Sequence, residues 1–288
     1  MNTDFEKYRL AVVGAGVMGT NISALAIGHG VPVVLVDVDE SVLAGARATI
    51  KQKLRHAQLM GVLPAERPPG TLTTSVSLDD IAEATTVIEA VTEVAEVKEK
   101  VLTVASALVR PGTTLISNTS CIPIDEMASW VLRPDELVGV HFMNPSYLIK
   151  MVEVIRGPRT GPAILAAVTG LLTALGRQAL VIRDSPGFVI NRLLHPLINT
   201  AAMLVEEGVA SAEVVDGLLE GCLGHSTGPL RTGDLIGLDN LVDSLNVLYE
   251  RRGDESCRPC DLLLAKVRDG HLGRKSGQGF FDYGKVVS

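Results

Sequence analysis

His141 is the residue of this chain best suited to moving a proton. It follows Leu137-Val138-Gly139-Val140, an apolar run typical of a buried strand. Histidine changes charge between about pH 5 and 8, so a well-placed imidazole can take the proton of an alcohol. A carboxylate on one ring nitrogen would direct the other nitrogen toward substrate and stabilise the charged ring. Glu153 is the candidate for that partner, provided that the fold brings the two together.

The stretch from Leu10 to Asp37 has the pattern of a dinucleotide-binding unit. An apolar run precedes the glycines, a helix-compatible segment follows them, and a second apolar run ends at Asp37. In such a unit Gly14 permits the tight turn, Gly16 lets a pyrophosphate reach the backbone, and Gly19 lets the helix pack on the strand. Asp37 would accept hydrogen bonds from ribose hydroxyls and repel a 2′-phosphate, so the sequence predicts NAD rather than NADP.

The elements that would position these residues alternate between strands and helices. Beyond the first two, strands are expected at Thr71–Ser75, Thr86–Val91, Thr114–Ser117, Leu137–His141, Lys150–Ile155 and Gln178–Ile182. Between them, helices are expected at Glu40–Met60, Pro123–Val131 and Pro162–Leu175. Ligands of open α/β sheets bind outside the carboxyl ends of the strands. Glu93, Ser120 and His141 should therefore lie at the same edge as the glycine turn.

The pattern changes at Asp184. From Phe188 onward the spacing predicts only helices, at Val189–Glu207, Ala212–Leu219, Asp234–Arg251 and Arg258–Asp269. The sequence thus predicts an α/β fold, with an N-terminal Rossmann-type, mostly parallel sheet and a smaller all-helical C-terminal domain. The expected domains are residues 1–184, which would bind NAD, and residues 185–288.

Composition favours a cytoplasmic enzyme. A net charge of −7 over 288 residues argues against binding to nucleic acid or to an anionic membrane. No apolar run reaches the roughly 18 residues of a transmembrane helix, and the first residues lack the layout of a signal peptide. The pair Cys257-x-x-Cys260 has no second pair or histidine set to complete a zinc site, so two reduced thiols and no metal are expected.

Short motifs occur in order from about Tyr8 to Tyr283. They are Gly14-x-Gly16-x-x-Gly19, Val87-Ile88-Glu89-Ala90-Val91-x-Glu93, Ser117-Asn118-Thr119-Ser120, His141-Phe142-x-Asn144-Pro145, Val152-Glu153-Val154, Pro186-Gly187-Phe188-Val189-x-Asn191-Arg192 and Gly273-Arg274-Lys275-Ser276-Gly277-x-Gly279-Phe280. Together they resemble the 3-hydroxyacyl-CoA dehydrogenases of the 3-hydroxybutyryl-CoA type. The resemblance implies NAD-dependent interconversion of an (S)-3-hydroxyacyl thioester and the 3-oxoacyl thioester.

The resemblance also implies roles for individual residues. His141 would be the catalytic base and Glu153 its partner, while Ser120 and Asn191 would place the C3 oxygen of the substrate. The implied cofactor-binding positions are Gly14, Gly16, Val17, Met18, Gly19, Asp37, Glu93, Lys98 and Asn118. Because Asn191 belongs to the helical domain, the active site is expected between the domains.

Family members are usually homodimers through the helical domain, which is therefore expected to serve both substrate binding and dimerisation. The apolar face suited to this contact is Ile190, Leu193, Leu194, Leu197 and Ile198.

The sequence departs from the family pattern in the loop after His141 and near residue 230. Ser146-Tyr147-Leu148-Ile149 replaces small apolar residues and proline. Where the family usually has an acidic residue after Gly-Pro-Leu, this chain has Arg231-Thr232-Gly233, with His225 nearby. Surface drift is the simpler explanation. If these residues line the cleft instead, the acyl group is more polar than butyryl.

Three readings of the function stay open at this point. Arg47, Lys51 and Arg55 form a positive strip that is either a solvated face or a landing place for coenzyme A or for an acyl carrier protein. The enzyme could thus act on an acyl-CoA or on a carrier-bound group, such as a glyceryl unit in polyketide extender biosynthesis. The third reading is a catalytically silent NAD-binding protein.

Overall fold

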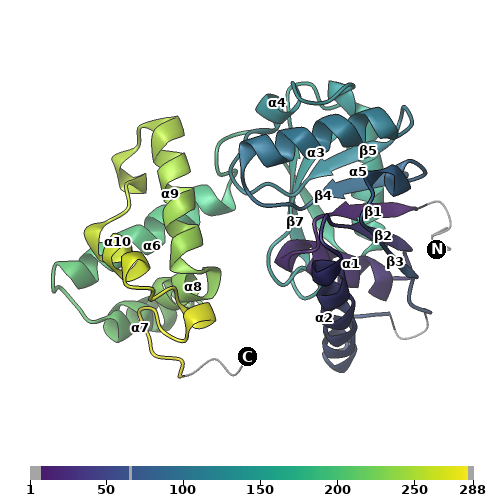
Figure 1. The fold of residues 1–288 in the computed structure, drawn as a ribbon. Helices are drawn as coiled ribbons and strands as arrows, with labels where there is room; N and C mark the ends of the chain where they lie inside the picture. The colour runs from purple at the N-terminus through teal and green to yellow at the C-terminus, as the bar shows by residue number, and fades with distance from the viewer. Residues whose placement is uncertain (1–7, 65–66, 285–288) are drawn as a thin grey trace. The chain divides into compact units, whose positions relative to one another are not determined.

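The computed structural model describes residues 8–64 and 67–284 (Figure 1). The chain divides into two compact units, Met1–Asp184 and Ser185–Ser288. Among the described residues, no helix combines the length and the apolar character needed to cross a membrane.

One eight-stranded sheet organises the N-terminal unit. Its strands are β1 (Leu10–Val13), β2 (Val33–Val36), β3 (Leu72–Ser75), β4 (Thr86–Glu89), β5 (Thr114–Ser117), β6 (Leu137–His141), β7 (Met151–Arg156) and β8 (Gln178–Arg183). Their order across the sheet is β3-β2-β1-β4-β5-β6-β7-β8. The pairs from β3 to β6 are parallel, β7 is antiparallel to β6, and β8 is parallel to β7. The predicted α/β fold with a mostly parallel sheet is confirmed.

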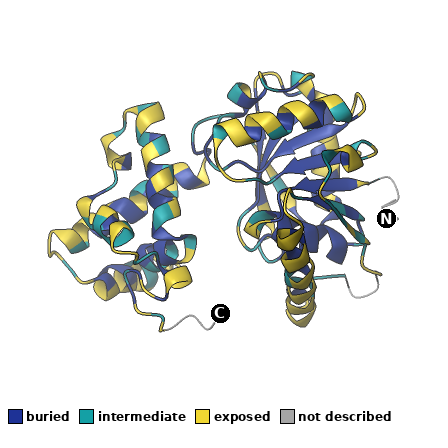
Figure 2. Ribbon diagram, viewed as in Figure 1, coloured by how far each residue is buried: buried dark blue, intermediate teal, exposed yellow. Residues whose placement is uncertain are grey.

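The central strands are apolar because helices cover both faces of a parallel sheet. Every residue of β1, β4, β5 and β6 is buried, and Figure 2 shows these strands in dark blue. The buried polar residues of these strands include Glu89, Ser117 and His141, which stand at the ends of β4, β5 and β6.

The helices of this unit are α1 (Val17–Gly28), α2 (Glu40–Leu59), α3 (Ala95–Leu108), α4 (Ile124–Met127) and α5 (Pro162–Ala174), with short 3₁₀ turns at Leu78–Ile81 and Pro134–Glu136. Asp39 caps α2 by accepting a hydrogen bond from the Ser41 N–H at 2.7 Å. The helix expected at Pro123–Val131 is shorter. After Met127 the N–H groups of Ser129 and Trp130 bond only three residues back, so the α-helical pattern ends there.

The C-terminal unit is helical throughout its described part. Its helices are α6 (Ile190–Glu206), α7 (Ala212–Leu223), α8 (Pro229–Ile236), α9 (Leu238–Arg252) and α10 (Asp261–Arg268), with 3₁₀ turns at Glu255–Cys257 and Arg274–Ser276. Ile198, Leu238, Leu241 and Leu245 lie at the centre of its core. Cys257 and Cys260 are buried free thiols beside the start of α10.

The single helix expected at Asp234–Arg251 is wrong, because two helices occupy this region. Gly237 separates α8 from α9 with φ of +98°, a backbone conformation that no α-helix contains. The apolar spacing continues across Gly237, so periodicity alone did not reveal the break.

Candidate active site

His141 and Glu153 form a buried pair at the edge of the sheet. β6 ends at His141 and β7 runs back beside it, so the register sets His141 opposite Glu153. Nδ1 of His141 lies 2.7 Å from Oε2 of Glu153, and the side chains are 6% and 8% exposed. Because an ionised carboxylate only accepts hydrogen bonds, Nδ1 carries the hydrogen and Nε2 is the basic nitrogen of the ring.

The glycine turn has the geometry that its residue types predict. Gly14 has φ of +103°, and a Cβ atom there would lie 2.6 Å from the Ala90 carbonyl oxygen. A Cβ atom at Gly19 would lie 1.8 Å from the carbonyl oxygen of Gly14, so α1 approaches β1 this closely only without one. At Gly16 a Cβ atom would meet nothing within 4 Å. The backbone at Gly16 therefore faces open space that a pyrophosphate can use.

The start of α1 and Asp37 complete this part of the site. Gly16 is the N-cap of α1 and offers no side chain to the first amides, which leaves them for an anionic ligand. Val17 is exposed and Met18 is half-buried in the same turn. Asp37 follows β2 and is half-buried, and its Oδ2 accepts a hydrogen bond from the Ala15 N–H at 2.8 Å. The residues present thus fit a dinucleotide with free ribose hydroxyls.

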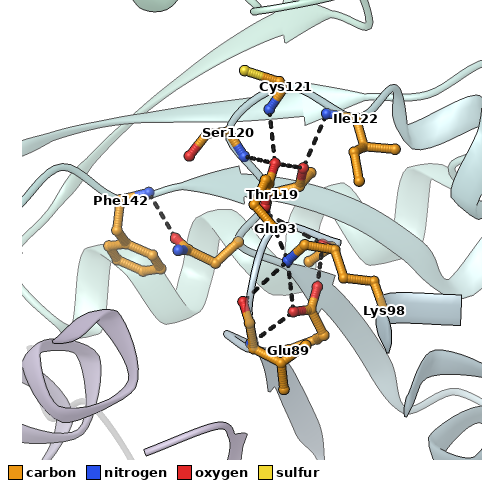
Figure 3. A network of polar contacts seen from close by, with 11 residues as sticks. Glu89, Glu93, Lys98, Thr119, Ser120, Cys121, Ile122 and Phe142 are labelled. Carbon is orange, nitrogen blue, oxygen red and sulfur yellow. Dashed lines mark hydrogen bonds and ion pairs between the residues drawn. The ribbon is translucent and has the colours of Figure 1, made fainter. Parts of the chain in front are cut away.

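Glu89, Glu93 and Lys98 form a charged network where β4 and β5 end (Figure 3). The Lys98 ammonium lies 2.7 Å from Glu89 Oε1 and 3.2 Å from Glu93 Oε2, and its side chain is 1% exposed. Burial would lower the pKa of Lys98, but the two carboxylates outweigh that effect and raise the pKa above its ordinary value.

The loop after β5 carries Ser120 and is tied to its surroundings on both sides. Ser120 is half-buried, and its N–H donates to Glu93 Oε1 at 2.7 Å. Asn118 is buried, and its Oδ1 accepts a hydrogen bond from the Phe142 N–H at 3.1 Å, directly after His141. Ser120 and His141 thus lie at one connected edge of the sheet, where the strand ends predict them, and Asn118 links the two loops there.

Known proteins resemble this chain in both sequence and fold. The family model for the 3-hydroxyacyl-CoA dehydrogenase NAD-binding domain matches residues 9–185, and the model for the C-terminal domain matches residues 187–283. The chain belongs to the 3-hydroxyacyl-CoA dehydrogenase family. It is 38% identical to the 3-hydroxybutyryl-CoA dehydrogenase of Bradyrhizobium diazoefficiens, over 96% of this chain and 95% of that protein.

Two further relatives cover nearly the whole length of this 3-hydroxyacyl-CoA dehydrogenase family member. The probable 3-hydroxybutyryl-CoA dehydrogenase of Bacillus subtilis is 38% identical, over 97% of this chain and 99% of that one. The crystal structure of FadB2 from Mycobacterium tuberculosis superposes with a TM-score of 0.91 at 35% identity, over 96% of this chain and 99% of that one.

The departure from the family pattern after His141 has a structural explanation. Tyr147 is buried, its hydroxyl lies 3.1 Å from Nδ1 of His56 on α2, and the two rings meet edge to face. Lys53, one turn earlier, donates to the side-chain Oδ1 of Asn21 at 2.9 Å, and Nδ2 of Asn21 donates to Oδ1 of Asn144 at 2.9 Å. These hydrogen bonds therefore hold the loop after β6 against α1 and α2.

Sequence analysis did not predict these hydrogen bonds between the loop and the two helices, and it gave Glu89 no role. A signal for Glu89 was present, since a carboxylate at the end of the apolar run Thr86-Val87-Ile88 requires a buried partner. Nothing comparable marked the link between His56 and Tyr147, which joins residues 91 positions apart.

The remaining predicted positions lie on α2 and in the C-terminal unit. Arg47, Lys51 and Arg55 are all exposed, and Arg47 also donates hydrogen bonds to Thr74 on β3 and to Glu40 at the start of α2. The second departure also has a structural explanation, because the Arg231 guanidinium lies 3.9 Å from the centre of the Phe281 ring. His225 is exposed.

Asn191 stands in the first turn of α6 and is 7% exposed. Of the apolar face expected on that helix, Leu193 is 69%, Ile190 40% and Leu197 39% exposed. Leu194 is half-buried, and Ile198 is fully buried in the core of its own unit, so Ile198 does not belong to an outward face.

Proposed function

We propose that this protein is an NAD-dependent dehydrogenase that interconverts (S)-3-hydroxybutyryl-CoA and the 3-oxoacyl-CoA. The observation that carries the proposal is the His141–Glu153 pair, 2.7 Å apart, at the carboxyl edge of the sheet that bears the glycine turn. Membership of the family and the names of the relatives support coenzyme A as the carrier and a four-carbon acyl group as its cargo. A cytoplasmic location stays a prediction from composition.

The chain's own groups suit the oxidation of a secondary alcohol. NAD, when bound, supplies the acceptor for the hydride that leaves C3. Nε2 of His141 takes the hydroxyl proton as the C3 oxygen becomes a carbonyl oxygen, and Glu153 stabilises the resulting imidazolium through Nδ1–H. In the opposite direction the imidazolium returns that proton. Ser120 and Asn191 are the groups that we propose to orient the C3 oxygen.

The direct test is a steady-state assay of NADH absorbance with 3-hydroxybutyryl-CoA and NAD. His141→Ala should lower kcat by about 10²–10⁴ while NADH still binds, since general-base catalysis contributes that much. His271→Ala, a histidine outside the site, is the matched control and should keep its activity. Wild-type turnover in His141→Ala would overturn the assignment. A wild-type enzyme that binds NADH but oxidises no hydroxyacyl thioester would support the catalytically silent reading.

An acyl carrier protein is the second candidate carrier. Lys51 and Arg55 are exposed cations one turn apart on α2. An acidic protein surface or a nucleotide phosphate suits such a face. The values of kcat/KM for hydroxybutyryl-CoA and for a glyceryl carrier protein should be compared. The variant Lys51→Glu/Arg55→Glu should lower kcat/KM for the carrier that these two cations bind. A higher value with the CoA substrate excludes the carrier protein.

A homodimer is the assembly that we propose. Ile190, Leu193 and Leu197 are exposed apolar side chains on one helix, and Leu193 alone is 69% exposed. A second copy of the same helix would cover them. Light scattering should give twice the mass of the chain, and Leu193→Glu/Leu197→Glu should give the monomer. A wild-type monomer at micromolar concentration would contradict the proposal.

A further inference from the structure

The Glu93 carboxylate holds the backbone of the loop that carries Ser120. Its Oε1 atom accepts hydrogen bonds from the Ser120 N–H at 2.7 Å and from the Cys121 N–H at 3.0 Å, and also from the Thr119 hydroxyl. Thr119 in turn accepts a hydrogen bond from the Ile122 N–H at 3.1 Å. One carboxylate oxygen thus sets the path of the chain across four residues.

Lys98 fixes the position of that carboxylate. Its ammonium lies 3.2 Å from Glu93 Oε2 and 2.7 Å from Glu89 Oε1, out of contact with solvent. This one ammonium thus balances the charge of two carboxylates, of which Glu89 is fully buried and Glu93 is 38% exposed. The geometry therefore makes Lys98 the counterion of the two carboxylates.

Glu89 anchors the arrangement in the sheet. It is fully buried at the end of β4, where Oε1 accepts from the Val91 N–H at 2.9 Å and Oε2 from the Ser117 hydroxyl at 2.6 Å. Ser117 ends β5, directly before the loop. Ser117 and Glu93 thus both contact the loop. Ser117 is bonded to Glu89 directly, and Glu93 is linked to Glu89 through Lys98, so both contacts depend on the end of β4.

We infer that Glu93 is a positioning residue for Ser120, acting through the backbone of residues 119–122, and that Lys98 serves it as counterion. Figure 3 shows the Ser120 hydroxyl on the side of its backbone away from Glu93, which holds the loop through the Ser120 N–H. This role differs from the direct contact with NAD that the resemblance implies for both residues. The inference rests on the proposed function, because Ser120 is there the group that orients the C3 oxygen.

A double-mutant cycle on Glu93 and Ser120 separates the two roles. Glu93→Ala should lower kcat by about 10–100-fold in the wild-type background, the order expected for a misplaced catalytic group. In the Ser120→Ala background the same change should cost less than about threefold, because the hydroxyl that Glu93 positions is already gone. Equal losses in both backgrounds would overturn the inference, and so would a large rise in the Kd of NADH with an unchanged kcat.

Two further variants control for a general loss of structure. Glu93→Gln keeps an acceptor oxygen for the two amides and should retain more activity than Glu93→Ala. Glu96→Ala removes an exposed carboxylate three residues away, in the first turn of α3, and should leave kcat unchanged. A Glu93→Gln enzyme as impaired as Glu93→Ala would contradict a role through these hydrogen bonds.

Hydrogen exchange tests the inference even if the proposed substrate is wrong. In the full chain without substrate, Glu93→Ala should speed the exchange of the Ser120 and Cys121 amides, while Glu96→Ala should not. Unchanged exchange overturns the inference whatever the enzyme acts on. Absence of activity in the wild-type protein, with faster exchange in Glu93→Ala, would instead count against the proposed function alone.

Discussion

His141 and Glu153 lie directly opposite each other on β6 and β7, with the imidazole Nδ1 2.7 Å from the carboxylate. The antiparallel direction of β7 produces this contact. Its third residue lies beside the carboxyl end of β6, whereas a parallel strand would place its own carboxyl end there.

Replacement of the carboxylate should impair the base without affecting the cofactor. Glu153→Gln removes the charge that stabilises the imidazolium and offers an amide that can hold the wrong ring tautomer, so kcat should fall by about 10²–10⁴. NADH binding, followed by fluorescence titration, should be unchanged. Glu153→Asp keeps the charge and should lose less activity. A Glu153→Gln enzyme with wild-type kcat would show that the pair is structural.

Two glycines of the turn should respond differently to alanine. The backbone at Gly16 faces open space, so Gly16→Ala should weaken NADH binding at a stability cost of at most about 1 kcal/mol. At Gly19 the added atom would lie 1.8 Å from the Gly14 carbonyl oxygen, so Gly19→Ala should cost about 3 kcal/mol or more. Urea unfolding and NADH titration measure the two effects. Equal stability of the two variants would contradict the turn geometry.

The stability of the protein should depend on the ionisation of Glu93. Burial would raise the pKa of Glu93, but the Lys98 ammonium and the hydrogen bonds from the loop outweigh it and hold the pKa below its ordinary 4.5. A depressed folded-state pKa gives a stabilisation that is complete above about pH 4.5 and is lost as the pH falls through the folded-state value. The difference in unfolding free energy between wild type and Glu93→Gln should therefore be larger at pH 7 than at pH 3. A constant difference would contradict the network.

The contribution of Lys98 to stability should be lost at alkaline pH, whereas that of Glu93 is lost at acidic pH. Its pKa is raised above the ordinary 10.5, so its stabilisation is present below pH 10.5 and is lost as the pH rises through the folded-state value.

Adjacent residues of the loop after His141 offer a matched pair of substitutions. Tyr147→Phe removes the hydrogen bond to His56 and should cost about 0.5–1.5 kcal/mol in unfolding free energy. Ser146→Ala should be neutral or slightly stabilising, because within the described residues the buried Ser146 hydroxyl has no hydrogen-bond partner. Thermal unfolding should rank the variants in this order. A more stable Tyr147→Phe protein would show that the fastening to α2 contributes nothing.

The C-terminal unit allows a similar comparison between two glycines. A Cβ atom at Gly221 in α7 would meet nothing within 4 Å, so Gly221→Ala should stabilise the helix by about 0.5–1 kcal/mol. Gly237 has φ of +98°, so Gly237→Ala should destabilise by about 1–3 kcal/mol. Calorimetry of the full chain measures both changes. A stable Gly237→Ala protein would favour the continuous helix that the apolar spacing predicts.

The sequence by itself determined the sheet, the glycine turn and the edge at which the chemistry belongs. Buried parallel strands have continuous apolar sequences, and ligands bind at their carboxyl ends. Local pattern alone therefore placed Gly14, Asp37 and His141 at that edge of the sheet. Local pattern also predicted a boundary near Asp184, because the period of the apolar residues changes there.

The tertiary structure alone decided which side chains meet. The contacts of His141 with Glu153, of Lys98 with Glu89 and Glu93, and of His56 with Tyr147 join residues 5 to 91 positions apart. Each depends on strand direction, register or helix packing, which arise from burial across the whole unit, so neighbouring residues do not specify the partner. The helix predicted at Asp234–Arg251 was wrong for a related reason. The backbone angle of Gly237 ends one helix there, although the apolar spacing continues past it.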